Sequence, residues 1–282
     1  MLLFRQIMKN NTTNLVSAQW LAQQLDHQQV VIIDCRFRLA DPEWGYQQYL
    51  HSHIPGAHYL HLDQDLSSPV STHGGRHPLP NPEQFATKLA SLGINQGETL
   101  VIAYDDFRLA FASRVWWLLR YLGHSQVAVL DGGWQGWLEG NYPVTDIVPQ
   151  PKSGNFIPQP NPDWIVDLET VKTFQEQAQT ILVDSRDNYR YLGMSEPIDP
   201  IAGHIPGAIN LPWKAVTNEQ GYLLPIQEQQ QRWQTYQPAT EIIVYCGSGV
   251  TACVNLLSLS IAGIDHGKLY PGGWSDWCSY LT

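Results

Sequence analysis

The feature that most constrains the fold of this chain is an internal repeat. An apolar run that ends in Asp-x-Arg occurs twice, as VVIIDCRF at 30–37 and as TILVDSRD at 180–187. The segment HIPGA also occurs twice, at 53–57 and at 204–208. Two further pairs follow in the same order: VIAYD at 101–105 with IIVYC at 242–246, and DGGWQGW at 131–137 with PGGWSDW at 271–277. Matches in one order at a nearly constant offset indicate a tandem duplication of one domain.

The boundary between the two copies is expected in a proline-rich stretch. Residues 146–162 contain five prolines and no periodic apolar pattern, which is typical of a semi-extended linker. The 282 residues are enough for two domains of ~100–150 residues each. We therefore predict a first domain over 14–145, a linker over 146–162 and a second domain over 163–282.

Each copy alternates short apolar runs with stretches of helical character. The runs at 180–183 and 241–245 are rich in β-branched residues, and such continuous runs indicate strands that are buried on both faces. A helix is expected after the second run, over 250–262, and a matching helix is expected in the first copy around 113–122. This alternation predicts the α/β class, in which helices flank a parallel sheet.

Composition excludes several classes of protein. A net charge of −10, from 16 basic and 26 acidic residues, argues against a nucleic-acid partner, which selects a basic surface. With 43% hydrophobic and 11% aromatic residues the chain is globular. It has no apolar run of the ~20 residues that span a membrane, and its start, MLLFRQIMKNNTTN, does not read as a secretory signal. Four cysteines without a Cys-x-x-Cys pair fit a reduced, cytoplasmic protein.

The strongest local motif is YCGSGVTA at 245–252, where a predicted strand is followed by Cys246, a glycine-rich turn and a helix. Backbone N–H groups of such a turn can converge into a nest that binds anions and favours a thiolate. We therefore predict that Cys246 is a nucleophile. The nest would be formed by Gly247, Ser248, Gly249, Val250 and Thr251.

A purely structural cysteine is the alternative for Cys246, but it leaves the Gly-Ser-Gly turn unexplained. Cys253, inside the predicted helix, is expected to be a packed hydrophobe, and Cys35 and Cys278 are also expected to be structural. A phosphatase site of the Cys-x5-Arg type is disfavoured because Ala252 occupies the arginine position.

Two cations follow the strand at 180–184. In the segment DSRDNYRYLG, Arg186 and Arg190 are either surface residues or groups that bind an anionic donor. Their position at the carboxyl end of a strand favours the second interpretation, because ligands of open α/β sheets bind there.

These motifs, in this order, resemble the tandem-domain rhodanese family of sulfurtransferases over nearly the whole chain past residue 14. The resemblance implies that Cys246 carries a persulfide, that Arg190 contacts the donor's anionic group and that Arg186 is held by a carboxylate. It also implies an active site in the second domain that faces the first, and no metal or organic cofactor. Asp105 stands where Cys246 stands in the second copy, so the first domain is expected to be catalytically inactive.

The loop after Cys246 bears on the donor. Family members that use thiosulfate carry Cys-Arg-Lys-Gly-Val-Thr, whereas Gly247 and Ser248 resemble the loop of 3-mercaptopyruvate enzymes, in which the serine hydroxyl assists proton transfer. Those enzymes also carry an arginine in a Glu-Pro-Arg-Asp segment, and Ile198 takes that place here. The sequence therefore favours 3-mercaptopyruvate and leaves thiosulfate open. The acceptor would be cyanide or a thiol, and a persulfide carrier without turnover is the alternative class.

Several residues remain without an assigned role. His204 is expected to anchor a turn, whereas His53 either does the same or helps to move a proton. His73 and His77 in STHGGRHPLP have only weak metal-ligand spacing, and no metal is expected. The sequence leaves the oligomeric state open, a monomer included.

Overall fold

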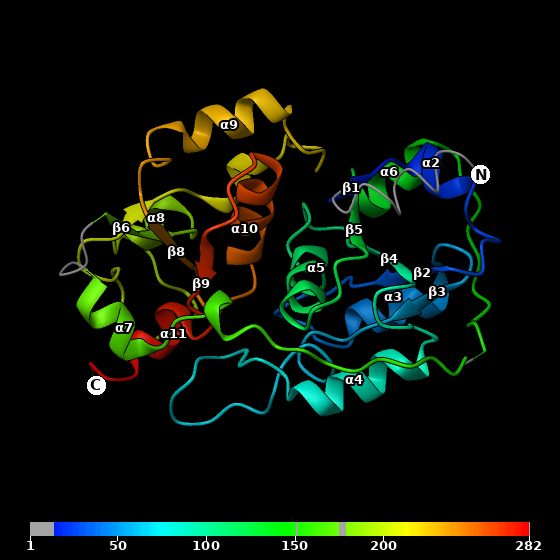
Figure 1. Cartoon of the computed structure of the whole chain (residues 1–282), viewed down its shortest axis with the longest axis horizontal. Coiled ribbons are helices and arrows are strands. Elements are labelled where there is room, and N and C mark those ends of the chain that lie inside the picture. Colours follow the sequence, from blue (N-terminus) through cyan, green and yellow to red (C-terminus); the bar gives the residue numbers. More distant parts are fainter. Residues whose placement is uncertain (1–13, 151, 175–178, 282) are drawn as a thin grey trace. The chain divides into compact units, whose positions relative to one another are not determined.

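The computed structural model describes residues 14–150, 152–174 and 179–281 of the chain (Figure 1). Within them the chain forms two compact units. The first unit contains the described residues up to Ser67 together with 80–160 and 219–222, and the second contains 68–79, 161–218 and those from Leu223 onward. The predicted boundaries follow the repeat and do not anticipate that 68–79 joins the second unit and 219–222 the first.

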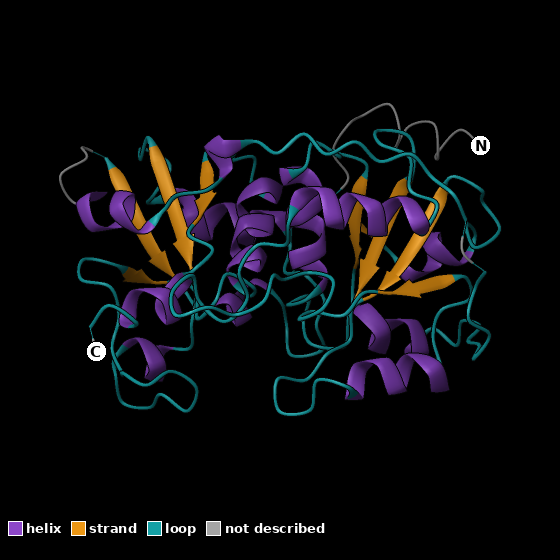
Figure 2. Cartoon of the chain, turned by 90° about the horizontal axis from the view of Figure 1, so that it is seen from below, coloured by secondary structure: helices purple, strands orange, loops and turns teal. Residues whose placement is uncertain are grey.

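A five-stranded parallel sheet forms the centre of the first unit, and Figure 2 draws its strands as orange arrows. The strand order is β1-β5-β4-β2-β3. The strands are β1 (Leu15–Val16), β2 (Val30–Asp34), β3 (Ala57–Tyr59), β4 (Leu100–Tyr104) and β5 (Val127–Leu130). β4 is buried along its whole length, which agrees with its continuously apolar sequence.

Helices cover both faces of this sheet. Trp20 of α2 and Trp137 of α6 pack with β-strand residues such as Ile102 in one apolar cluster. α5 packs against β4 and β5. The helices of the unit are α2 (Ala18–Ala22), α3 (Trp44–His51), α4 (Pro82–Ser91), α5 (Ala112–Tyr121) and α6 (Gly133–Glu139).

The second unit repeats this plan with a four-stranded parallel sheet of order β7-β6-β8-β9. Its strands are β6 (Thr180–Asp184), β7 (Ile209–Asn210), β8 (Glu241–Tyr245) and β9 (Gly267–Leu269). The helices are η1 (Pro162–Trp164), α7 (Leu168–Thr173), α8 (Asn188–Tyr191), η3 (Trp213–Val216), α9 (Ile226–Gln234), α10 (Ala252–Ile261) and α11 (Gly273–Cys278). Val171 of α7 and Trp274 of α11 share an apolar cluster with Ile243 of β8, and α10 packs against β8 and β9.

The α/β class predicted from the sequence is confirmed, because each unit has a parallel sheet with helices packed on it. The helix expected over 250–262 begins two residues later, at Ala252, because the preceding residues form the loop after Cys246. None of the helices within the described ranges is long and apolar enough to span a bilayer.

The four repeated motifs meet at the carboxyl ends of the strands. In the first unit the Asp34 carboxylate pairs with the Arg36 guanidinium. It also accepts a hydrogen bond from the Tyr104 hydroxyl at 2.6 Å. The Tyr104 hydroxyl in turn accepts the N–H of Ile54, within HIPGA, at 3.3 Å, and Arg36 stacks on Trp134 of the GGW segment. The motifs are therefore parts of one packing arrangement.

The second unit makes the same arrangement from the matching residues. Arg186 pairs with Asp184 and stacks on Trp274, and the N–H of Ile205 donates to the hydroxyl of Tyr245 at 3.2 Å. The repetition of this packing explains why the motifs recur at a nearly constant offset.

Candidate functional site

The predicted site residues lie at the topological switch point of the second sheet. β6 is connected to β7 on one side of it, and β8 is connected to β9 on the other side. Ligands of open α/β sheets bind in the crevice outside the carboxyl ends of two such strands. Arg186 follows the end of β6 and Cys246 follows the end of β8, and these two strand ends are paired in register.

Cys246 is buried and has a free thiol. The other three cysteines are also buried and free, but their thiols contact backbone carbonyls: Cys35 that of Ile33, Cys253 that of Gly249 and Cys278 that of Ser275. Burial raises the pKa of the Cys35 and Cys278 thiols, so these side chains stay neutral.

The backbone of the loop after Cys246 is held by the first turn of α11. The N–H groups of Trp274 and Ser275 donate to the carbonyls of Cys246 and Gly247 at 2.8 and 2.9 Å. Gly249 has a φ of +72°, and a Cβ there would lie 2.4 Å from the carbonyl oxygen of Pro271. This position therefore requires glycine.

The equivalent loop of the first unit shows what this backbone does. The buried carboxylate of Asp105 accepts four backbone hydrogen bonds, from Phe107 and Leu109 at 2.7 and 3.1 Å and from Phe111 and Ala112 at 2.8 Å each. Burial of the carboxyl nonetheless raises its pKa to about 6. The strand–loop–helix thus directs N–H groups at the side chain that follows the strand.

The loop after Cys246 stands at the corresponding place in the second unit. Gly249 matches Arg108 in having a positive φ, whereas Leu109 has a positive φ and its counterpart Val250 does not. By analogy with the loop at Asp105, we expect N–H groups of the loop after Cys246 to point toward its sulfur. An outer persulfide sulfur carries negative charge, which such a cradle stabilises.

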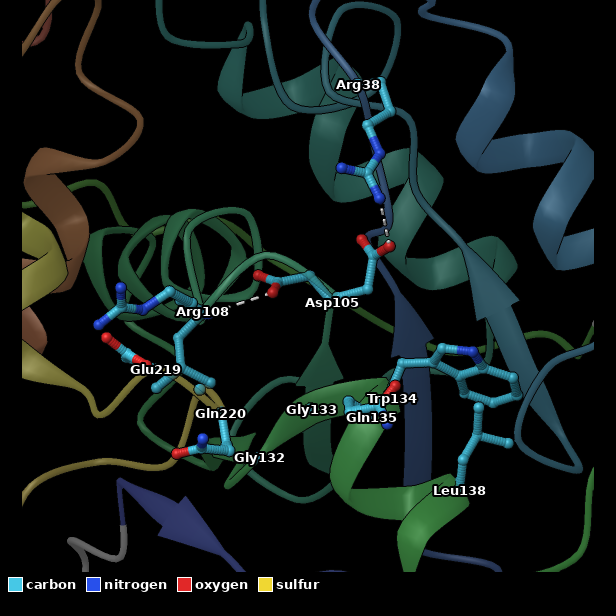
Figure 3. Close-up of a pocket in the computed structure, with 13 residues that line it drawn as sticks. Arg38, Asp105, Arg108, Gly132, Gly133, Trp134, Gln135, Leu138, Glu219 and Gln220 are labelled. Carbon is cyan, nitrogen blue, oxygen red and sulfur yellow. Dashed lines mark hydrogen bonds and ion pairs between the residues drawn. The ribbon is translucent and has the colours of Figure 1, made fainter.

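A cavity of about 370 Å³ lies next to Asp105 in the first unit (Figure 3). Arg38 and Asp106 form an ion pair of 3.0 Å on its wall. Among the described residues that line it there is no thiol and no hydroxyl group: Arg38, Asp105, Asp106, Arg108, Leu109, Gly132, Gly133, Trp134, Gln135, Leu138, Glu219, Gln220 and Gly221. The carboxylate that fills this cradle cannot form a persulfide, so the geometry supports an inactive first unit.

Arg186 is fully engaged within the protein. Its Nε and Nη2 bind Asp184, Nη1 lies 3.2 Å from Glu196 and Nη2 also donates to the carbonyl of Gly203 at 2.6 Å. Arg36 makes the matching bonds in the first unit, which has no cysteine in its cradle. Arg186 therefore ties the end of β6 to the segment that carries Glu196 and Gly203, and it leaves little of its guanidinium for a donor.

Arg190 lies closer to the cradle and is only partly engaged. Its Nε and Nη2 bind the two oxygens of Glu196 at 3.0 and 2.7 Å, and Nη2 also reaches Asp199 at 3.1 Å. Burial would raise the pKa of Glu196, but the hydrogen bond and the charge of Arg190, together with the backbone N–H groups of Asp199 and Ile198, hold that pKa below its usual value. Arg190 Nη1 has no hydrogen-bond or ion-pair partner among the described residues and lies 3.6 Å from the Cβ position of Gly247.

Two residues of this site were not predicted from the sequence, Arg76 and His77. His77 Nδ1 lies 2.7 Å from the Ser248 hydroxyl, with both side chains buried, and Arg76 forms an ion pair with Asp199. In the sequence, the only signal in this segment is the weak metal-ligand spacing of His73 and His77. The described residues contain no cluster of three or more potential metal ligands.

The segment 68–79 is docked on α11 and the residues that follow it. The N–H of Gly74 donates to Asp276 at 2.7 Å, and His73 Nδ1 lies 2.8 Å from the Ser279 hydroxyl. The ring of His73 stacks on Tyr280 with a centroid distance of 3.9 Å. These contacts hold the segment within the second unit although it comes from the first half of the sequence.

The histidines of both HIPGA segments are turn anchors. His53 is buried, stacks on Tyr49 and places its ring nitrogens 2.6 and 3.2 Å from the carbonyls of Tyr49 and Ile147. His204 contacts the carbonyl of Tyr191 at 2.7 Å in the second unit. Of the two roles considered for His53, the structure supports the anchor.

Comparison with known protein families finds one domain twice in the chain, once in each copy of the repeat. The family model described as a rhodanese-like domain matches residues 17–140 and 167–280. A protein of Pseudomonas aeruginosa described as a probable 3-mercaptopyruvate sulfurtransferase is 41% identical over 272 residues, which is 95% of each chain. The 3-mercaptopyruvate sulfurtransferase of Escherichia coli K12 is 36% identical over 277 residues, again 95% of each chain.

Comparison with solved structures finds the same fold in a related protein. The crystal structure of SseA from Escherichia coli, described as a 3-mercaptopyruvate sulfotransferase with the rhodanese fold, matches with a TM-score of 0.82 at 35% identity. The match covers 94% of this chain and all of the SseA chain. With two matching domains, a repeated parallel-sheet fold and a cysteine at the switch point of the second sheet, the chain belongs to the rhodanese family.

Proposed function

We propose that the chain is a sulfurtransferase that takes a sulfur atom from 3-mercaptopyruvate onto Cys246 and delivers it to a thiophilic acceptor such as cyanide or a thiol. The observation that carries this proposal is the setting of Cys246. It is a buried, free cysteine at a topological switch point, in a loop whose counterpart holds a carboxylate by four N–H groups.

In the first step the Cys246 thiolate attacks the sulfur of the donor. A sulfur–sulfur bond forms, the donor's carbon–sulfur bond breaks and its electron pair remains on carbon as the enolate of pyruvate. Protonation of this enolate gives pyruvate and leaves the persulfide on Cys246. The N–H groups of the loop would stabilise the charged outer sulfur.

Ser248 and His77 are placed to handle the proton. The Ser248 hydroxyl lies 2.7 Å from His77 Nδ1 and belongs to the loop that follows Cys246, so a proton can pass between the imidazole and a group in the cradle. In the second step the acceptor attacks the outer sulfur, and Cys246 leaves as the thiolate. No other group of the protein changes its redox state.

Arg190 is the group that would bind the carboxylate of the donor, because Nη1 is not used by the described residues and faces Gly247. The family resemblance of the Gly247–Ser248 loop and the names of the relatives favour 3-mercaptopyruvate. Thiosulfate, which is also anionic, is the second donor to test.

The test is mass spectrometry of the protein after treatment with 3-mercaptopyruvate in the absence of an acceptor. We expect an adduct of one sulfur atom, about 32 Da, on the peptide that carries Cys246. Cys246→Ser should lose both the adduct and all turnover. Cys35→Ala, which changes a buried cysteine of the first unit, should keep both.

An unmodified Cys246 peptide in the wild-type protein would overturn the proposed mechanism. A large preference for thiosulfate in kcat/KM would overturn the choice of donor. A stable persulfide without turnover toward cyanide or thiols would instead identify a sulfur carrier.

A further inference from the structure

We propose that Arg76 is the second guanidinium of the donor site and binds the donor's carboxylate together with Arg190. This inference deepens the proposed function and rests on it. It concerns the position at which the sequence carries Ile198 instead of an arginine. Ile198 is 44% exposed and supplies no cation.

A single buried carboxylate holds the two arginines side by side. Asp199, whose side chain is 2% exposed, pairs through Oδ1 with Arg76 Nη1 and through Oδ2 with Arg190 Nη2. Two guanidinium groups that bind the same carboxylate lie close together and would repel each other without it. Asp199 therefore fixes their mutual position before any donor binds.

The remaining edges of both guanidinium groups face the cradle. A Cβ built on Gly247 would lie 2.8 Å from Arg76 Nη2 and 3.6 Å from Arg190 Nη1. Neither of these two nitrogens has a hydrogen-bond or ion-pair partner among the described residues. Gly247 directly follows Cys246, so the unused N–H groups lie beside the position that the reacting donor must occupy.

The ion pairs of the site leave two guanidinium edges available for an anion. Three arginines of the site, Arg76, Arg186 and Arg190, face three carboxylates, Asp184, Glu196 and Asp199. Each nitrogen of the Arg186 guanidinium has a partner in the protein, whereas Arg76 and Arg190 each keep an edge that no described residue binds. Two guanidinium edges match the two oxygens of a carboxylate, which favours a keto acid as the donor.

The test compares two donors that differ only in the carboxylate, 3-mercaptopyruvate and 1-mercaptopropan-2-one. Arg76→Gln should lower kcat/KM for 3-mercaptopyruvate by about tenfold or more, mainly through KM, because one charge-assisted hydrogen bond is lost. The same variant should change kcat/KM for the ketone by less than about twofold. Arg76→Lys should fall between wild type and Arg76→Gln, since it keeps the charge but not the fork.

A second measurement is the inhibition constant of pyruvate, which carries the carboxylate but no transferable sulfur. Arg76→Gln should raise this constant by a similar factor. The matched control is Arg38→Gln, which removes an arginine from an ion pair with Asp106 in the first unit. It should leave both donors and the inhibition constant unchanged.

Each negative result has a distinct meaning. If wild-type Cys246 gains no sulfur from any donor, the proposed function fails. If wild type turns over and Arg76→Gln leaves both KM for 3-mercaptopyruvate and inhibition by pyruvate unchanged, the assignment of Arg76 is overturned. An equal loss for the ketone and the keto acid also overturns it, because Arg76 would then act on the structure and not on the carboxylate.

Discussion

At the scale of single residues, two glycines of the loop after Cys246 are needed for different reasons. Gly249 has a positive φ, and a Cβ there would collide with the backbone of Pro271. A Cβ on Gly247 would instead meet the ends of two flexible side chains, those of Arg76 and Arg190. Gly249 preserves the conformation of the loop, and Gly247 keeps the space in which the guanidinium groups approach the backbone.

This difference predicts two distinct phenotypes. Gly247→Ala should raise KM for 3-mercaptopyruvate at least about fivefold, because the guanidinium groups must move, while the free energy of unfolding changes by less than about 1 kcal/mol. Gly249→Ala should destabilise the protein by about 2 kcal/mol or more, because its backbone is strained and the neighbour is rigid. Steady-state kinetics and urea titrations measure both quantities. A Gly247→Ala enzyme with an unchanged KM would contradict the placement of the two arginines.

At the scale of elements, α5 ends in a turn whose buried histidine must stay neutral. His124 Nδ1 accepts the N–H of Gly97 at 3.1 Å, and Nε2 donates to the carbonyl of Thr99 at 2.9 Å. Protonation of Nδ1 would break the first bond. Burial lowers the pKa of His124 to about 4.

This pKa predicts a loss of stability in mild acid. A histidine whose pKa is lowered in the folded state binds more protons when unfolded, so its contribution is complete above pH ~6.5 and is lost as the pH falls toward the folded value. Over this range the loss should be about 3 kcal/mol for the wild type. His124→Gln should flatten this slope in urea titrations at pH 7.5 and 5. The exposed His51→Gln is the control, and an equal slope in all three proteins would contradict the prediction.

Elements were predicted well where burial fixes the sequence pattern. The runs at 180–183 and 241–245 correspond to β6 and β8, because strands covered on both faces must be apolar throughout. The start of α10 was predicted two residues early. Val250 is apolar and buried like a helical residue, but it lies in the loop between Cys246 and the start of α10.

At the scale of the whole molecule, the units that fold together are not the halves of the sequence. Segment 68–79 comes from the first repeat but packs in the second unit, where it brings Arg76 and His77 to the loop of Cys246. Its docking is tight at Gly75, which has a φ of +81° and lies where a Cβ would be 2.4 Å from the carbonyl oxygen of Gly272.

Gly75→Ala should therefore loosen this segment and impair catalysis without touching Cys246. We expect kcat/KM for 3-mercaptopyruvate to fall at least about tenfold, and amide exchange within 68–79 to rise, while amides of β8 remain protected. Kinetics and hydrogen-exchange mass spectrometry test this together. Faster exchange with unchanged kinetics would mean that Arg76 and His77 have no part in turnover.

The sequence by itself determined the repeat, the α/β class, the cysteine and the inequality of the two copies. These features depend on local patterns: continuous apolar runs, a glycine-rich turn after a strand, and Asp105 in place of a thiol. Cys246, Arg186 and Arg190, the residues of the proposed site, could be named because they follow strand ends, and parallel strands bring their carboxyl ends to one edge of a sheet.

Only the tertiary structure decided which residues join them. Arg76 and His77 lie about 170 positions before Cys246, in a segment without a periodic pattern, and no local rule says where such a segment docks. Likewise, Arg186 and Arg190 look alike in the sequence, yet within the described part of the chain packing leaves the first fully paired and the second with an edge that has no partner. Long-range packing sets these differences because a guanidinium binds whichever carboxylates the fold brings within reach, and sequence distance does not enter that choice.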